Sequence, residues 1–298
     1  MRVRILLPLL LLLSFLLGAA AAETDDWSAY RADTDSEYLS LEDVDKIRDW
    51  DAFYAFLGRF PRLKEVDMFH IPVDYTRAEE LHARFPGVEF GLTMRFSEHT
   101  VRTDATAFST QHVHSAQWHN VQQLAVLRFC KNMYALDIGH NNFTDLSFLR
   151  EMPQLRVLIL AVGPATDISP LEDLVHLEYL ELFWNRITDI SPLTSMKYLM
   201  DLNLVNNLIL DLSPLKELKS LQRLWIYMCD RGNTDPVKPS VVADLQAALP
   251  NCWINSWDTS TAGGWREHPR FQVLKRIFKT GVYEPFEDSP PENRPEGF

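Results

Sequence analysis

Apolar residues recur with a period of 22 along the middle of the chain. Each copy of this repeat opens with an apolar residue and carries two more, at its fourth and sixth positions. In order of position, these residues are Met133, Leu155, Leu177, Leu199 and Leu221; Leu136, Leu158, Leu180, Leu202 and Leu224; and Ile138, Leu160, Leu182, Leu204 and Ile226. Because successive side chains of a strand point to opposite faces, each copy predicts a short strand with its fourth and sixth residues inward. The third, fifth and seventh residues then point outward.

The ninth position of the repeat is mostly asparagine. The residues there are Asn141, Gly163, Asn185, Asn207 and Cys229. A buried carboxamide can hydrogen-bond main-chain groups that a turn leaves unpaired, so this position predicts the point at which the chain leaves the strand.

The second half of each copy predicts a short helical return segment. Three copies carry Asp-Ile-Ser-Pro-Leu or its Leu variant, at 167–171, 189–193 and 211–215. A Ser oxygen suits a helix cap and Pro suits a first helical position. The apolar residues expected to face the strands are Leu171, Leu193, Leu215, Leu174, Met196 and Leu218. Stacked copies would bury one continuous core and expose a parallel sheet.

The string L-x-x-L-x-L-x-x-N/C-x-L is the leucine-rich-repeat pattern, and five copies stand in phase over residues 133–229. With Asp-Ile-Ser-Pro-Leu in its return segment, the 22-residue unit resembles the bacterial internalin-like class of leucine-rich repeats. The resemblance implies an α/β solenoid, a right-handed superhelix with a parallel sheet on its concave face. It also implies a secreted or surface-displayed binding module without catalytic residues or cofactors, and it names no ligand.

The flanks of the repeats predict helical caps at both ends of the solenoid. Residues 23–40 are acidic and lack an apolar period, so we expect disorder there. Residues 41–132 predict an N-terminal cap and irregular repeats, with an amphipathic helix from Leu41 to Leu57 and a strand from Val88 to Phe96.

Residues 230–283 predict the last strand and the C-terminal cap. We expect a helix from Ser240 to Leu249 and a strand over Cys252–Ile254. A second amphipathic helix, from Arg266 to Gly281, should close the C-terminal end of the solenoid. Residues 284–298, rich in Pro and Glu, predict a disordered tail.

The N-terminus has the features of a secretory signal peptide. Arg2 and Arg4 precede an apolar run that ends in small residues, and cleavage is expected before Glu23. The alternative is a retained membrane anchor. The 13 residues from Ile5 to Leu17 rise only about 20 Å as a helix, short of a hydrocarbon core of about 30 Å. We therefore expect a secreted or cell-envelope protein with no stable membrane span after cleavage.

Charge and cysteine content narrow the set of partners. The formal charge is -12, and removing residues 1–22 with their two Arg gives -14. Such a surface repels phosphate backbones, which argues against a nucleic-acid partner.

Three Cys do not make a disulfide scaffold, and Cys130, Cys229 and Cys252 all fall at inward positions. We therefore expect three buried thiols, and a Cys229–Cys252 bridge between adjacent coils is the alternative, as the one attractive pairing.

Motifs for catalysis are absent from the sequence. It holds no G-x-S-x-G, P-loop, H-E-x-x-H or EF-hand loop. The repeat itself explains the acidic residues Asp145, Asp167, Asp189 and Asp211, because they share one turn position.

Segment 97–120 departs from the repeat pattern and predicts either an irregular repeat or a projecting hairpin. Its His112, His114 and His119 raise a weaker alternative, a metal-dependent hydrolase, but no Asp, Glu or Cys lies between them to complete a coordination shell.

The outward strand positions predict an aromatic binding patch on the concave face. With its polar border, the predicted partner-binding set is Tyr179, Glu181, Phe183, Trp184, Asp201, Asn203, Arg223, Trp225, Tyr227 and Trp253. Aromatic rings bordered by charges are typical of protein-binding hot spots, so we expect a protein or peptide ligand. A glycan is the alternative ligand, because flat sugar faces also stack on Trp and Tyr. The other open possibility is that a helix or the C-terminal cap covers these rings.

Overall fold

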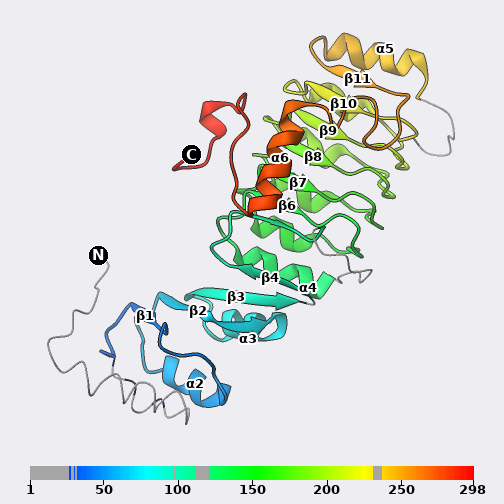
Figure 1. Ribbon diagram of the computed structural model, residues 1–298. Coiled ribbons are helices and arrows are strands. Elements are labelled where there is room, and N and C mark those ends of the chain that lie inside the picture. Colours follow the sequence, from blue (N-terminus) through cyan, green and yellow to red (C-terminus); the bar gives the residue numbers. More distant parts are fainter. Residues whose placement is uncertain (1–26, 28–29, 31, 97, 112–120, 231–236) are drawn as a thin grey trace. The chain divides into compact units, whose positions relative to one another are not determined.

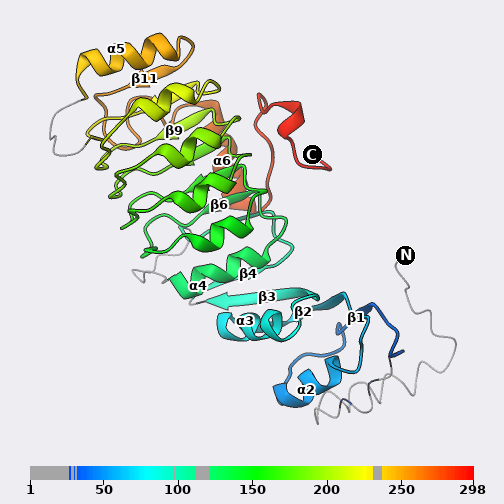
Figure 2. The same cartoon turned by 180° about the vertical axis from the view of Figure 1, so that it is seen from behind.

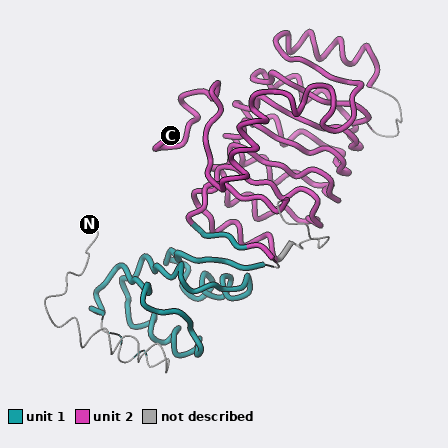
Figure 3. The backbone as a smooth tube through the Cα atoms, viewed as in Figure 1, with its two compact units in different colours: residues 1–96, 100–103 teal, residues 97–99, 104–298 magenta. Residues whose placement is uncertain are grey.

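The computed structural model describes residues 27, 30, 32–96, 98–111, 121–230 and 237–298. The chain divides into two compact units, residues 1–96 with 100–103 and residues 97–99 with 104–298 (Figure 3). The expected signal peptide and the histidines at 112, 114 and 119 lie outside the described residues. Among the helices that the structure does describe, none has the length and apolar character for crossing a membrane.

The first unit is built on a four-stranded sheet, counted over the described residues. The elements of this part of the chain are β1 (Tyr38–Ser40), α2 (Trp50–Leu57), β2 (Glu65–Asp74), α3 (Tyr75–Arg84), β3 (Glu89–Phe96) and β4 (His99–Arg102), with sheet order β1-β2-β3-β4. β1 and β3 both pair with β2 in parallel. The strand expected up to Phe96 is confirmed as β3. The helix expected from Leu41 starts only at Trp50, because the Asp49 side chain caps it by accepting the Ala52 N–H at 2.9 Å.

The prediction of disorder over residues 23–40 is wrong for the part that the structure describes. The Trp27 ring is buried against Phe53 and Phe56, with ring centroids 4.8 and 5.0 Å apart. Tyr38–Ser40 forms β1 in register with β2. The prediction relied on the acidic composition of the segment and overlooked its aromatic residues, such as Trp27, which give the segment an apolar surface to bury.

The second unit is a solenoid with one parallel sheet. The strands are β5 (Ala107–Ser109), β6 (Ala135–Asp137), β7 (Val157–Ile159), β8 (Tyr179–Glu181), β9 (Asp201–Asn203), β10 (Arg223–Trp225) and β11 (Trp253–Asn255) (Figure 1). Each pairs in parallel with the next, so that the fourth positions of successive repeats, such as Leu158 and Leu180, stand side by side. The solenoid predicted from the 22-residue period is confirmed.

The irregular segment contributes one more coil. β5 pairs in parallel with β6, and Phe108 stands opposite Leu136 at the fourth position. The described residues around β5 are therefore an irregular repeat and not a projecting hairpin.

The return segments are short helices on the face of the sheet opposite to α6 (Figure 2). They are α4 (Val121–Ala125), η1 (Val126–Phe129), η2 (Ser147–Glu151), η3 (Ser169–Asp173), η4 (Ser191–Ser195) and η5 (Ser213–Glu217), the last five being 3₁₀ helices. The cap differs from the expected Ser oxygen. Asp167 accepts the Ser169 N–H at 2.8 Å, and the other three turn aspartates do the same two residues upstream of their serine. The carboxylate thus satisfies a main-chain donor that the helix start leaves free.

The ninth-position asparagines join neighbouring coils. The Asn185 amide donates to the carbonyls of Leu182, in its own coil, and Leu160, in the preceding one, at 2.9 and 2.8 Å. Its carbonyl oxygen accepts the Ala165 N–H at 3.1 Å. The role expected for this position is confirmed.

A feature that the sequence did not reveal lies one residue earlier. The eighth position of every repeat has a positive φ in a non-glycine residue, and these residues are His140, Val162, Trp184, Asn206 and Met228, with φ between 50 and 58°. This left-handed conformation is unfavourable for ordinary side chains, most of all for a β-branched one such as Val162. It turns the chain out of the strand, and at Trp184 the side chain is exposed by 54%.

The C-terminal part corrects two expectations. α5 (Pro239–Ala248) leads into β11 at the end of the sheet, but α6 (Pro269–Thr280) lies across the open face of the sheet and does not close the end (Figure 1). Residues 284–298 are not a disordered tail. They include η6 (Pro291–Asn293), and Ser289 and Asn293 are buried against the solenoid.

Replacing Asn185 with Leu should lower the free energy of unfolding by about 1 to 3 kcal/mol, because buried main-chain groups of two coils lose their partner. Urea denaturation measures the change. Asn132→Leu is the matched control, since Asn132 is exposed just before the first repeat. Equal stability of the two variants would contradict the structural role of the asparagine ladder.

Candidate binding surface

The structure buries most of the predicted binding residues. Seven of the ten have little or no solvent exposure, and these are Tyr179, Glu181, Phe183, Asp201, Asn203, Arg223 and Trp225. Tyr227 is partly buried. Only Trp184 and Trp253 are well exposed, by 54% and 49%.

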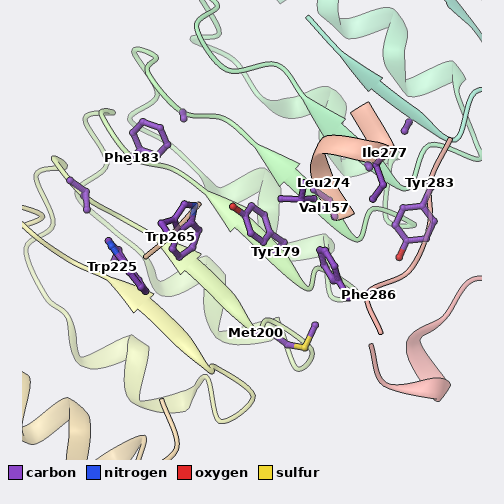
Figure 4. Packing of buried hydrophobic residues seen from close by; sticks show 14 residues of the cluster. Val157, Tyr179, Phe183, Met200, Trp225, Trp265, Leu274, Ile277, Tyr283 and Phe286 are labelled. Atoms are coloured by element: carbon purple, nitrogen blue, oxygen red, sulfur yellow. The ribbon is translucent and has the colours of Figure 1, made fainter. Parts of the chain in front are cut away.

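The chain's own C-terminal segment covers this face. The Trp265 ring lies between Tyr179 and Trp225, with ring centroids 5.5 and 5.0 Å away (Figure 4). Leu274 and Ile277 of α6 extend the same apolar cluster, which also contains residues of β5, β6 and β7. The open face of the sheet is therefore the interior of a second layer.

The prediction of an exposed aromatic patch is wrong for the buried residues, and the alternative of a covering segment is right. Apolar side chains at outward positions need a cover, and a covering segment of the same chain excludes water from them as well as a partner does. The sequence showed that the helix Arg266–Gly281 has an apolar face. It did not show that this face packs on the open face of the sheet and not on the end of the solenoid.

The charges on the covered face pair with each other. Asp201 is fully buried and accepts from Arg223 Nε at 2.9 Å and from Arg270 Nη1 at 2.5 Å. Arg270 also pairs with Asp288, at 2.5 Å from Nη2 to Oδ2. Two cations thus meet two anions, as a buried network requires. These contacts within the chain occupy Asp201, so its carboxylate is not available to attract a basic binding partner.

Glu181 is likewise used inside the protein. Its Oε1 accepts from Trp265 Nε1 at 2.7 Å and from the Tyr179 hydroxyl. Burial raises the pKa of Glu181, and burial with the neighbouring Glu181 raises the pKa of Tyr179 well above its ordinary value. These contacts hold the covering Trp265 on the sheet.

Asp137 is a third buried acid of this face. Its carboxylate accepts the Gly139 N–H and the Ser109 hydroxyl, each at 3.1 Å. Burial outweighs these two bonds and, with a smaller contribution from Glu181, raises the pKa of Asp137 to about 7. Compared with water, the folded state therefore favours the neutral form of Asp137 over the charged form.

The thiols are not placed for chemistry. Cys130, Cys229 and Cys252 are free and buried, as expected, and the alternative Cys229–Cys252 bridge is not formed. Burial raises the pKa of Cys130 and of Cys252 to about 12, so both thiols are protonated near neutral pH and poorly nucleophilic. Within the described residues, no group of three His, Cys, Asp or Glu side chains is placed to hold a metal ion.

Three tryptophans form the exposed part of the candidate surface. Trp184, Trp253 and Trp257 are here called the tryptophan loop surface. Trp184 and Trp253 contact residues 256–264, and Trp257, exposed by 59%, belongs to that segment. Trp184 Nε1 donates to Ser260 Oγ at 2.8 Å, and the Trp253 ring lies beside Gly264, where an added Cβ would come within 3.2 Å of it. Sequence reasoning missed Trp257. Its signal is an aromatic residue in a Ser/Thr/Gly-rich stretch after the last strand.

No protein-family model and no curated protein matches the chain. The 22-residue unit and the parallel register of its strands decide the class of fold. The chain is a leucine-rich-repeat protein with internalin-like repeats. Solved structures similar to it include internalin C2 of Listeria monocytogenes, with 26% identity, a TM-score of 0.34, and coverage of 47% of this chain and 66% of that one.

Two further similar structures are bacterial proteins of leucine-rich repeats. A second internalin of Listeria monocytogenes has 18% identity and a TM-score of 0.37, with 72% of each chain covered. A leucine-rich-repeat protein of Leptospira interrogans has 16% identity and a TM-score of 0.37, with 67% of this chain and 50% of that one covered. The present chain thus spans just under two thirds of internalin C2.

Replacing Trp225 with Ala should lower the free energy of unfolding by about 3 to 5 kcal/mol, because its ring is packed between the sheet and Trp265. An exposed patch would instead leave stability nearly unchanged. Thermal and urea unfolding measure the change, with Trp257→Ala as the exposed control. A small effect at Trp225 would mean that the C-terminal segment does not cover the sheet in solution.

Replacing Asp137 with Asn should stabilise the protein in a pH-dependent way. A folded-state pKa of about 7, against an ordinary value of 3.8, means that the folded state holds the proton more tightly. The stability of the wild type therefore falls as the pH rises from about 4 to about 7. Asn can accept the Gly139 N–H with its oxygen and donate its amide to Ser109 Oγ, which reverses the second bond, and it carries no charge. Its advantage should therefore grow over this range to the order of 1 kcal/mol or more. Urea denaturation of both proteins between about pH 4 and about pH 7 measures this advantage. A stability difference that does not change with pH would refute the raised pKa of Asp137.

Proposed function

We propose that the chain is an exported, non-enzymatic recognition module that binds a partner protein through the tryptophan loop surface. The order of charge, apolar run and small residues over 1–22 supports export. The observation that carries the proposal is the exposure of Trp184, Trp253 and Trp257 next to a sheet whose other aromatic residues are covered.

Hydrogen bonds tie the loop that carries Trp257 to itself and to the sheet. Asn255 Oδ1 accepts the N–H groups of Trp257 and Asp258 at 3.1 and 3.0 Å, and its amide donates to Asp258 Oδ2 at 2.8 Å. Asn203 and Trp225 donate to the carbonyls of Ser260 and Ala262 at 2.7 and 3.0 Å. A loop held by the sheet presents its rings at little cost in conformational entropy on binding.

Exposed large apolar side chains support a protein ligand. Leu208 and Leu210, in the repeat that follows Trp184, are exposed by 40% and 63%. Tryptophan is one of the residue types most enriched among the hot spots that dominate binding energy at protein interfaces. Their exposure is unfavourable for the isolated chain, and a partner that covers them would relieve it.

A glycan ligand is the second candidate. The loop carries three hydroxyl residues in a row, Thr259, Ser260 and Thr261, and Asp258 is the one charged residue of the stretch 253–264. Asp258 is tied to Asn255. A charge-poor surface with tryptophan rings and hydroxyls suits a neutral sugar face, which stacks on the ring and hydrogen-bonds at its edge.

The test uses the mature chain starting at Glu23 as bait, with cell-envelope and host-surface proteins in one arm and a glycan array in the other. The double variant Trp184→Ala/Trp257→Ala should lose the ligand, with affinity lower by about 2 kcal/mol. Tyr38→Ala, at a residue exposed by 44% in the first unit, is the control and should bind as the wild type does. Retention of the same ligand by the double variant would contradict the proposed surface.

A further inference from the structure

The helix α6 has a second side, which faces solvent and is basic. Its buried side carries Leu274 and Ile277, which pack in the apolar cluster over the sheet (Figure 4). The residues of the other side, all of them exposed, are Gln272, Lys275, Arg276 and Lys279. They follow one another at intervals of three, one and three residues, so they form one stripe along the helix. We call Lys275, Arg276 and Lys279 the basic stripe.

The charge of this part of the chain is opposite to that of the whole. Residues 266–280 contain five Arg or Lys and one acid, Glu267, whereas the formal charge of the chain is -12. Of the five cations, only Arg270 is buried, where it pairs with Asp201 and Asp288. The other four are exposed. A locally basic surface on an acidic protein attracts anionic groups that the rest of the surface repels.

Contacts within the chain leave most of this charge without a counter-ion. Arg276 pairs with Glu284 at 2.7 Å, and both side chains stay about half exposed. Lys275 donates only to the neutral Gln272, at 3.3 Å, and among the residues that the structure describes neither Lys275 nor Lys279 forms an ion pair. Like charges three or four residues apart on a helix repel each other. The helix dipole offsets this repulsion at Lys279, in the last turn, but not at Lys275.

The Phe271 ring orders two of the exposed cations. The Arg266 guanidinium carbon and Lys275 Nζ each lie 5.7 Å from the centre of this ring. A cation–π contact restricts a long side chain without neutralising its charge. The conformational entropy that a partner would have to remove from these side chains is therefore already reduced.

The spacing of the stripe fits an extended acidic segment. Lys275 and Lys279 are four residues apart, which is a rise of about 6 Å along the helix. In an extended chain, alternate side chains point to the same side and are about 6.6 Å apart. A segment with an acid at every second position therefore brings successive carboxylates to successive cations of the stripe.

The composition of α6 does not suit a membrane surface. Helices that lie in a membrane interface insert large apolar side chains below their cations. The large apolar residues of α6, all of which the structure describes, are buried or partly buried, and Phe271 and Phe278 pack against the apolar cluster. The solvent side of the helix therefore offers charge without an apolar anchor, which favours a hydrophilic partner.

We propose that the basic stripe of α6 is a docking site for an acidic segment of a partner protein, bound in an extended conformation with carboxylates at alternate positions. The site uses no residue of the tryptophan loop surface and does not depend on the function proposed there. Its attraction is between exposed charges, so the affinity falls as the ionic strength rises.

The experiment uses the mature chain starting at Glu23 and a fluorescein-labelled peptide, Gly-Glu-Ser-Glu-Ser-Glu-Gly, followed by fluorescence anisotropy at low ionic strength. The double variant Lys275→Gln/Lys279→Gln should bind this peptide about five-fold or more weakly than the wild type does. Lys131→Gln/Lys197→Gln removes the same charge at two exposed positions of the solenoid and should bind as the wild type does. A peptide with Gln in place of Glu should not bind.

A variant with the opposite effect tests the role of Arg276. Glu284→Gln removes the acid that competes with a partner for this guanidinium, so it should tighten binding of the acidic peptide about two-fold or more. Glu287→Gln, at an exposed position nearby in the sequence, removes the same charge and should leave the affinity unchanged. Equal affinities of these two chains would contradict the proposed site.

The outcomes separate a built site from general attraction between opposite charges. Equal weakening by the two pairs of lysine substitutions, or no binding of the peptide by the wild type, would overturn the proposal. Binding of phosphatidylglycerol vesicles that Lys275→Gln/Lys279→Gln abolishes, without binding of the peptide, would assign the stripe to a membrane instead. The variant Trp184→Ala/Trp257→Ala should bind the peptide as the wild type does, so failure at the stripe leaves the tryptophan loop surface untouched.

Discussion

The hydrogen bonds of the ninth-position asparagines set the geometry on which the rest of the solenoid depends. Asn185 bonds main-chain carbonyls of its own coil and of the preceding coil, and Asn207 repeats the arrangement with Leu204 and Leu182. An apolar residue at this position would leave buried carbonyls unpaired, at a cost that no local packing recovers. The turn that brings the amide inward also forces the eighth residue into a left-handed conformation. Trp184 stands at this eighth position with a φ of 58°, and its ring is exposed.

The second constraint is the cover over the open face of the sheet. Tyr179 and Trp225 stand at outward positions and need a partner surface, and Trp265 and α6 provide it within the chain. This arrangement places Asp201 out of water, where it is stable only because Arg223 and Arg270 both reach it. The same segment shapes the candidate surface. Its first residues build the loop beside Trp184, and its last residues bond to the buried Glu178.

The sequence was sufficient for those features that repeat and insufficient for those that occur once. The strands, their register and the role of Asn185 follow from a period that five copies support, and a misreading of one copy would not change the result. The exposure of Trp184 was predicted correctly, as part of a patch whose other members proved to be mostly buried. The position of α6 and the contacts of Asn293 depend on pairings between residues more than 100 apart, for which a single sequence offers no period and no local signal. The acidic segment at 23–40 and the proline-rich segment at 284–298 were wrongly predicted to be disordered, because that prediction considered only the average polarity of each segment. A few anchors, Trp27 in one case and Phe286 and Asn293 in the other, were enough to order them.

An outward row of aromatic residues on a solenoid has two physical solutions, a cover from the same chain or a cover from a partner. The length of chain after the last repeat helps to decide between them. A helix of 12 residues such as α6 rises about 18 Å, and strands of a sheet are about 4.8 Å apart, so it can cross about four coils. With Trp265 just before such a helix and Leu274 and Ile277 on one side of it, the chain carries a complementary apolar surface of the required length. Binding surfaces are then to be sought where this cover ends and on its outer side. At one end of the strands the cover leaves tryptophans in water, and at the other it is completed by residues 284–298, which are held through both apolar and polar contacts.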